Sequence, residues 1–138
     1  MKRYFVLGVT LAAGVALGFV SSQIIQAQPS GYSKEQIYRG DLANLSGQEV
    51  IIYASDWPPG FRLPWHVHPE GHELVCVVEG EQTFEVDGIA IKVVKAGEVI
   101  HTPPNVAHYG RNATDKVSKT VVIRIKEKSQ PILVDLKK

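Results

Sequence analysis

Hydrophobic residues from Ile37 onward recur at every second position or in short blocks, a pattern typical of β-strands with one buried face. Turn-forming residues separate these blocks, as at Pro58-Pro59-Gly60 and Pro103-Pro104-Asn105. No stretch shows helical periodicity, so we expect an all-β chain with a closed or sandwiched antiparallel architecture. The predicted strands are Glu49–Ala54, Leu63–His68, Glu73–Glu79, Glu81–Val86, Ile89–Val94, Glu98–Thr102, Val106–Arg111 and Lys119–Lys126, with a short strand-like piece at Ile132–Leu136.

The dipeptide Asp87-Gly88 gives the sharpest local prediction, because two-residue hairpin turns of type I′ favour this pair. A hairpin of this kind fixes which residues lie opposite each other on the two strands. The predicted pairs are Val86 with Ile89, Phe84 with Ile91 and Thr83 with Lys92. The apolar side chains expected in the core are Val75, Val77, Phe84, Ile91 and Ile123.

The N-terminal segment differs from the rest of the chain. Lys2 and Arg3 precede an apolar run, and small and polar residues follow it, which is the layout of a secretory signal peptide ending near Ala27. The alternative is an uncleaved anchor, because Phe5–Ile25 is long enough to span a bilayer at about 20 residues. Both interpretations place the folded part outside the cytosol, in the periplasm or secreted. The expected organisation is a signal peptide at 1–27, a linker at 28–36 and one β domain at 37–138.

Composition narrows the classes of function. The 138 residues suffice for one domain, and 15 Lys and Arg against 14 Asp and Glu give a net charge of +1. A near-neutral chain lacks the basic surplus of a nucleic-acid-binding protein. Cleavage of the signal peptide would remove two basic residues and no acidic one, so no charge attraction to a membrane is expected afterwards. The single cysteine, Cys76, excludes an intrachain disulfide and a thiolate-rich zinc site.

The five histidines carry the clearest chemical signal. His66 and His68 alternate along a predicted strand, so their side chains share one face about 6–7 Å apart. Glu73 begins the next strand, whose inward face is otherwise apolar, and a carboxylate buried there is costly unless it is paired or bound to a cation. His101 and His108 lie further along the chain. Imidazole nitrogens with a carboxylate suit Fe, Mn, Ni, Zn or Cu.

The spacing of these residues is more specific than the residues themselves. One motif has five residues, then four, then six between its members Gly60, His66-x-His68, Glu73 and Gly80. A second has five, two and three residues between Gly97, Pro103-x-Asn105, His108 and Asn112. The two motifs, in this order, resemble those of the cupin superfamily. Asn105 stands where the second motif usually has Gly, and Asn is the residue that best tolerates the positive φ of such a turn.

This resemblance implies a double-stranded β-helix, the small jelly-roll barrel of single-domain cupins. It also implies that one divalent transition-metal ion is held by His66, His68, Glu73 and His108. Four protein ligands on an octahedral ion leave two adjacent positions for water, substrate or dioxygen.

Two further histidines are candidates near this site. His101 is the candidate catalytic residue, a pocket acid or base, because the ordinary pKa of histidine lies near neutral pH. The alternative is that His101 is simply a half-exposed residue of its strand. His72 is expected on the face opposite Glu73, while Glu70 is a weaker rival of Glu73 as ligand. Cys76 is expected to be a small buried hydrophobe.

Three functions remain open at this point, since the cupin fold hosts many chemistries. The interpretation we favour is a metal-dependent enzyme, of dioxygenase or isomerase type, acting on a small oxygenated molecule. One alternative is a non-catalytic module that binds a metal or a small molecule. The other is a barrel whose metal has only the structural role of holding the strands together. A homodimer is also expected, because Leu74, Cys76 and Val78 present an apolar face away from the metal.

Overall fold

The computed structural model describes residues 32–137, which form two five-stranded antiparallel sheets. The predicted signal peptide lies outside the described residues. One sheet has the order β1-β2-β9-β4-β7, and the other has the order β10-β3-β8-β5-β6. The strands are β1 (Ser33–Asp41), β2 (Gln48–Trp57), β3 (His66–Val67), β4 (Gly71–Glu79), β5 (Glu81–Val86), β6 (Ile89–Lys95), β7 (Val99–Thr102), β8 (His108–Arg111), β9 (Ser118–Glu127) and β10 (Val134–Asp135).

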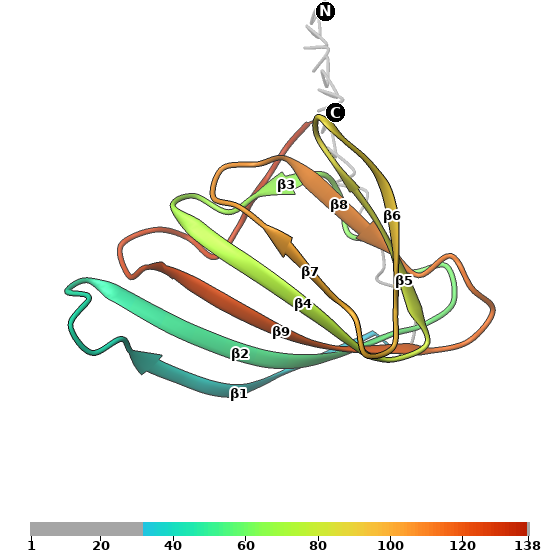
Figure 1. The fold of residues 1–138 in the computed structure, drawn as a ribbon, viewed down its shortest axis with the longest axis horizontal. Helices are drawn as coiled ribbons and strands as arrows, with labels where there is room; N and C mark the ends of the chain where they lie inside the picture. Colours follow the sequence, from blue (N-terminus) through green and yellow to red (C-terminus); the bar gives the residue numbers. More distant parts are fainter. Residues whose placement is uncertain (1–31, 138) are drawn as a thin grey trace, which may run out of the picture.

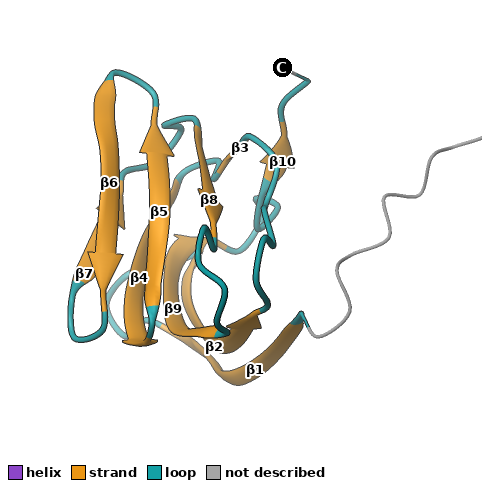
Figure 2. Cartoon of the chain, turned by 90° about the vertical axis from the view of Figure 1, so that its right-hand side faces the viewer, coloured by secondary structure: helices purple, strands orange, loops and turns teal. Residues whose placement is uncertain are grey.

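The two sheets pack face to face and enclose the core, as Figures 1 and 2 show from two sides. Along β2 and β9, fully buried residues alternate with half-buried ones, as expected when one face of a sheet is covered. The all-β jelly-roll prediction is therefore confirmed. The core contains Ile51, Tyr53, Val75, Val77, Phe84, Val86, Val94, Ile100 and Val122. No helix in the described part of the chain is long and apolar enough to cross a membrane.

The hairpin between β5 and β6 forms at Asp87-Gly88, but its predicted register is only partly correct. Val86 pairs with Ile89 as predicted, whereas Phe84 pairs with Lys92 and Thr83 with Val93. A β-bulge causes the difference, because β6 carries one extra residue between these pairs. The bulge turns the side chain of Ile91 outward, where it is 60% exposed, so the prediction of Ile91 as a core residue is wrong. Ile123 likewise lies on the outer face of β9 and is only half-buried.

The other difference is β1, which begins inside the segment expected to be a linker. Ser33 pairs with Asp56 of β2, and pairing continues to Asp41 through one register irregularity. Because β1 is an edge strand and its residues are almost all exposed, it carries little of the alternation that marks the central strands. The predicted strand Leu63–His68 is reduced to two residues, since Pro64 and Pro69 cannot donate backbone hydrogen bonds on either side.

Candidate metal centre

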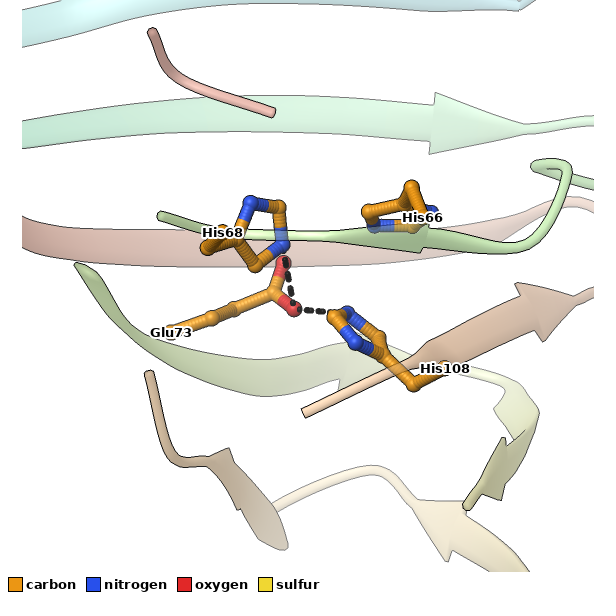
Figure 3. Close-up of side chains that lie close together, drawn as sticks. All are labelled: His66, His68, Glu73 and His108. Atoms are coloured by element: carbon orange, nitrogen blue, oxygen red, sulfur yellow. Dashed lines mark hydrogen bonds and ion pairs between the residues drawn. The ribbon is translucent and has the colours of Figure 1, made fainter. Parts of the chain in front are cut away.

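Four side chains with metal-binding atoms meet between the two sheets. They are the residues that the motifs single out: His66, His68, Glu73 and His108. All four are buried, and one ligand atom from each lies within 4.8 Å of the others. Figure 3 shows the three imidazole rings gathered around the carboxylate. Side chains distant in the sequence therefore form one compact cluster.

The strands explain this convergence. His66 on β3 lies directly opposite His108 on β8, so both rings leave the same face of one sheet. His68 follows two residues after His66 and its ring lies beside both, with ring centroids 4.8 and 5.0 Å away. Glu73 comes from β4 in the facing sheet, where alternation turns it inward with Val75 and Val77. The cluster thus bridges the two layers of the barrel.

Backbone carbonyls hold each imidazole in one orientation. The Nδ1 atoms of His66, His68 and His108 lie 2.7, 2.7 and 2.9 Å from the carbonyl oxygens of Pro64, Ile132 and Val106. A carbonyl oxygen can only accept, so each Nδ1 donates and the Nε2 of a neutral ring keeps its lone pair. The carbonyl partner thereby prepares Nε2 for a metal ion, as in protein metal sites generally.

The Nε2 atoms lack ordinary partners. Those of His66 and His68 are buried and have no hydrogen bond. The Nε2 of His108 lies 2.9 Å from Oε2 of Glu73, and that of His68 lies 3.4 Å from the same oxygen. A carboxylate oxygen and an unprotonated nitrogen are both acceptors, so a proton or a metal ion must lie between them. This observation shows that the donor set fits a divalent cation.

Arg124 sets the charge state of the carboxylate. Burial opposes ionisation of Glu73, but the positive charge of the Arg124 guanidinium, whose Nη2 lies 2.7 Å from Oε1, outweighs it. The pKa of Glu73 is therefore held well below its ordinary value. Burial also lowers the pKa of His66 to about 4 and lowers that of His68, so these rings are neutral near pH 7. Neutral imidazoles and an ionised carboxylate are the forms that bind metals.

A cavity of about 110 Å³ opens beside the cluster. One part of its lining is formed by His66, Glu73 and His108, and another by the charged or polar side chains of Lys34, Tyr53 and Arg124. Apolar residues complete the wall; they include Trp57, Leu63, Val75, Phe84, Val122 and Leu133. A ligand in this cavity would therefore contact the cluster and two basic side chains together.

His101 does not belong to this cavity, so the prediction of a pocket acid or base at this position is wrong. On β7 the neighbours Ile100 and Thr102 are buried, and alternation directs His101 outward, where it is exposed. His72 also lies on the outer face, opposite to Glu73, as predicted. The two imidazoles lie 3.0 Å apart, between His72 Nδ1 and His101 Nε2.

Other predictions near the site can be resolved as well. Glu70 is exposed, and its carboxylate accepts a hydrogen bond from Asn105 Nδ2 at 2.9 Å, so it is not a rival of Glu73 in the cluster. Asn105 has a φ of 64°, the positive value expected where the second motif usually has Gly. The ring of Trp65 packs against that of Tyr109, with centroids 5.0 Å apart.

Sequence reasoning missed Arg124, Tyr53 and Lys34. The signal for Arg124 was present, because it alternates with Val122 on the inward face of β9. A charged residue at such a position needs a buried partner. Lys34 had no comparable signal, since it lies on the exposed edge strand β1, within the segment predicted to be a linker.

Residues 55–124, half of the chain, match the family model of the cupin domain, and this match includes all four residues of the cluster. The chain belongs to the cupin family. This cupin is 30% identical over 115 residues to germin-like protein subfamily 2 member 4 of Arabidopsis thaliana, which covers 80% of the chain and 50% of that relative. It is 32% identical over 65 residues to quercetin 2,3-dioxygenase of Bacillus subtilis, covering 47% of this chain and 19% of the relative. The cupin thus spans about half the length of most curated relatives it matches, and less of the dioxygenase.

Solved structures share the fold. An oxalate oxidase in complex with glycolate superposes with a TM-score of 0.59 at 24% identity, over 80% of this cupin and 57% of that chain. The DMSP lyase DddQ from Ruegeria pomeroyi gives a TM-score of 0.61 at 20% identity, over 80% and 57% of the two chains. At these identities the likeness establishes the double-stranded β-helix alone.

Proposed function

We propose that this cupin is a metal-dependent enzyme that acts on a small carboxylate or a similar oxygen-rich anion. The observation that carries the proposal is the buried cluster of His66, His68, Glu73 and His108, whose donor atoms face one another beside a cavity. A transition-metal ion held there supplies Lewis acidity and free coordination positions for oxygen ligands. Imidazole and carboxylate donors suit Fe, Mn, Ni, Zn or Cu.

The basic side chains of the cavity support an anionic substrate. Arg124 is 3% exposed; its Nε donates to the hydroxyl of Tyr53 at 3.0 Å and its Nη2 pairs with Glu73, but its Nη1 has no partner. A buried guanidinium N–H without an acceptor is costly, and a ligand carboxylate would satisfy it. The cavity therefore offers a donor that the protein itself leaves unused.

Lys34 adds a second positive charge on β1. Its ammonium lies 3.9 Å from the centroid of the Tyr53 ring, and no carboxylate of the described residues lies within ion-pair distance. Desolvation, followed by the nearby guanidinium of Arg124, lowers the pKa of Lys34. An anion between Lys34 and Arg124 would relieve their repulsion, which is the behaviour of a substrate subsite.

The size of the cavity limits the substrate. A volume of about 110 Å³ is well below the ~300–1,000 Å³ of pockets that hold drug-sized ligands. A molecule of a few carbon atoms with one or two carboxylates fits this volume. The relative solved with glycolate, an oxalate oxidase, offers a parallel for such a ligand.

Turnover measurements test this proposal. The purified protein would be analysed for its metal, loaded with that metal, and screened with small mono- and dicarboxylates for oxygen uptake and for isomeric products. We expect turnover of at least one carboxylate, with a KM raised about tenfold or more in Lys34→Gln and unchanged in Lys119→Gln, whose lysine lies on the outer face of β9. Tight carboxylate binding without turnover would instead favour the non-catalytic binding module. No binding of any carboxylate would overturn the anionic substrate.

Export is a separate proposal, because it depends on the segment 1–27, which lies outside the described residues. The basic start and the apolar run that follows support it. Sequencing the N-terminus of protein recovered from its native compartment tests it. A new N-terminus near residue 28 is expected, whereas a full-length cytosolic chain would contradict export.

A further inference from the structure

We propose that His72 and His101 form a second metal site, on the outer surface, that binds a divalent transition-metal ion such as Cu²⁺. The two histidines come from neighbouring strands, β4 and β7, at the edge of one sheet. Both are exposed, and neither lines the cavity beside the buried cluster. The buried site and the substrate proposal therefore leave this pair without a role.

The distance between the two nitrogens suits a single ion. Nδ1 of His72 and Nε2 of His101 lie 3.0 Å apart, and the rings are nearly parallel, at 22°. Two imidazole nitrogens bound at ~2.0–2.1 Å with a right angle between the bonds lie about 2.9 Å apart. A single ion can thus be bound by both nitrogens in place of the hydrogen bond between them, once the rings turn toward it. Right-angled nitrogen donors and the order of metal affinities favour Cu²⁺.

The backbone holds the pair in place. Thr102 pairs with Glu73 and His101 pairs with Leu74 across the two strands, so both imidazoles stand on a fixed antiparallel ladder. Across the sheet, Ile125 and Ile123 are the β9 partners of His72 and Leu74, and they present no charge that would repel a cation. Solvent can supply the remaining ligands, because both rings are exposed.

The outer site is separate from the buried one. His72 and Glu73 are consecutive and point to opposite faces of β4, so one ion cannot reach both. An ion on the outer face would link the edge strand β7 to β4. Because it binds only when the two strands are paired, it would also raise the stability of the folded protein.

Copper titration of the full-length protein tests the proposal. We expect wild type to bind one more equivalent of Cu²⁺ than His101→Gln or His72→Gln by calorimetry, and to show an electron paramagnetic resonance signal of copper with two nitrogen ligands that each variant lacks. Copper should raise the thermal midpoint of wild type more than that of either variant. Lys119→Gln, an exposed change on the same face, serves as control and should behave as wild type. Equal copper binding in wild type, His101→Gln and His72→Gln would overturn the second site.

The same titration distinguishes the outer site from the buried one. A protein with His66→Ala and His68→Ala lacks the buried site, and it should still bind one copper ion that is lost on adding His101→Gln. If the buried site were wrongly assigned, this double variant would bind as much copper as wild type. That result would leave the comparison of wild type with His101→Gln as an independent test of the surface pair.

Discussion

Replacing Glu73 by Gln should destabilise the metal-free protein as well as weaken metal binding, because Glu73 is the counter-charge of Arg124. Both residues are buried, since Glu73 is 6% exposed and Arg124 is 3% exposed. Nη2 of Arg124 lies 2.7 Å from Oε1 of Glu73. Removing one partner of a buried ion pair costs about 3–5 kcal/mol, since the other charge stays uncompensated. The new amide can still accept one hydrogen bond from Arg124, so we expect a loss near the lower limit, about 3 kcal/mol. This is a large part of the ~5–15 kcal/mol stability of a small domain.

Urea unfolding in the presence of a chelator measures this effect. Tryptophan fluorescence, to which Trp57 (4% exposed in the native fold) and the half-buried Trp65 both contribute, reports the transition. His72→Ala is the matched control, because it changes the adjacent residue on the outer face, and it should stay within about 0.5 kcal/mol of wild type.

A second variant separates the charge effect from packing. Combining Glu73→Gln with Arg124→Met removes both charges, so no uncompensated charge remains buried. The double variant should therefore recover most of the lost stability without recovering metal binding. Wild-type stability of Glu73→Gln, or a double variant as unstable as Glu73→Gln alone, would refute the pairing of Glu73 with Arg124.

Three further outcomes follow from other parts of the molecule. The hydrogen bond from Arg39 holds the pKa of Glu49 at about 2, although burial opposes ionisation. The contribution of the Glu49 carboxylate to stability is therefore present above pH 4.5 and is lost as the pH falls toward 2. Between pH 5 and pH 3, the free energy of unfolding should change less in Glu49→Gln than in wild type. Asn105→Gly should leave the thermal midpoint nearly unchanged, whereas Asn105→Val should cost about 1–2 kcal/mol, since its φ is 64°. Light scattering at micromolar concentration should give a dimer mass for wild type and a monomer mass for Val78→Asp, which alters a residue 56% exposed on β4; a wild-type monomer would contradict the expected homodimer.

The buried cluster could be predicted from the sequence because the spacing of the motifs encodes it. The structure places His66 at the start of the short strand β3, His68 directly after that strand, and Glu73 near the start of β4, with all three side chains buried. For His101, the prediction of a pocket position was wrong because the alternation of inward and outward side chains along a strand was not applied to β7. The same alternation, applied to its neighbours Ile100 and Thr102, directs His101 outward.

The parts that could not be predicted depend on tertiary contacts. Arg124 reaches Glu73 because β9 lies next to β4, a neighbourhood that local periodicity does not encode. The bulge in β6 shifts Ile91 to the surface, and a turn dipeptide such as Asp87-Gly88 fixes only the first pair of its hairpin. Lys34 enters the cavity from a strand whose exposed, polar residues resemble a linker.

Metal content per chain tests the central claim most directly. Elemental analysis would be performed on protein carrying His101→Gln, so that only the buried cluster can contribute a site. We expect about one transition-metal ion per chain in this protein and none when His66→Ala and His68→Ala are added, with the fold checked by circular dichroism. A full equivalent of metal in the folded triple variant would contradict the assignment of the site to His66, His68, Glu73 and His108.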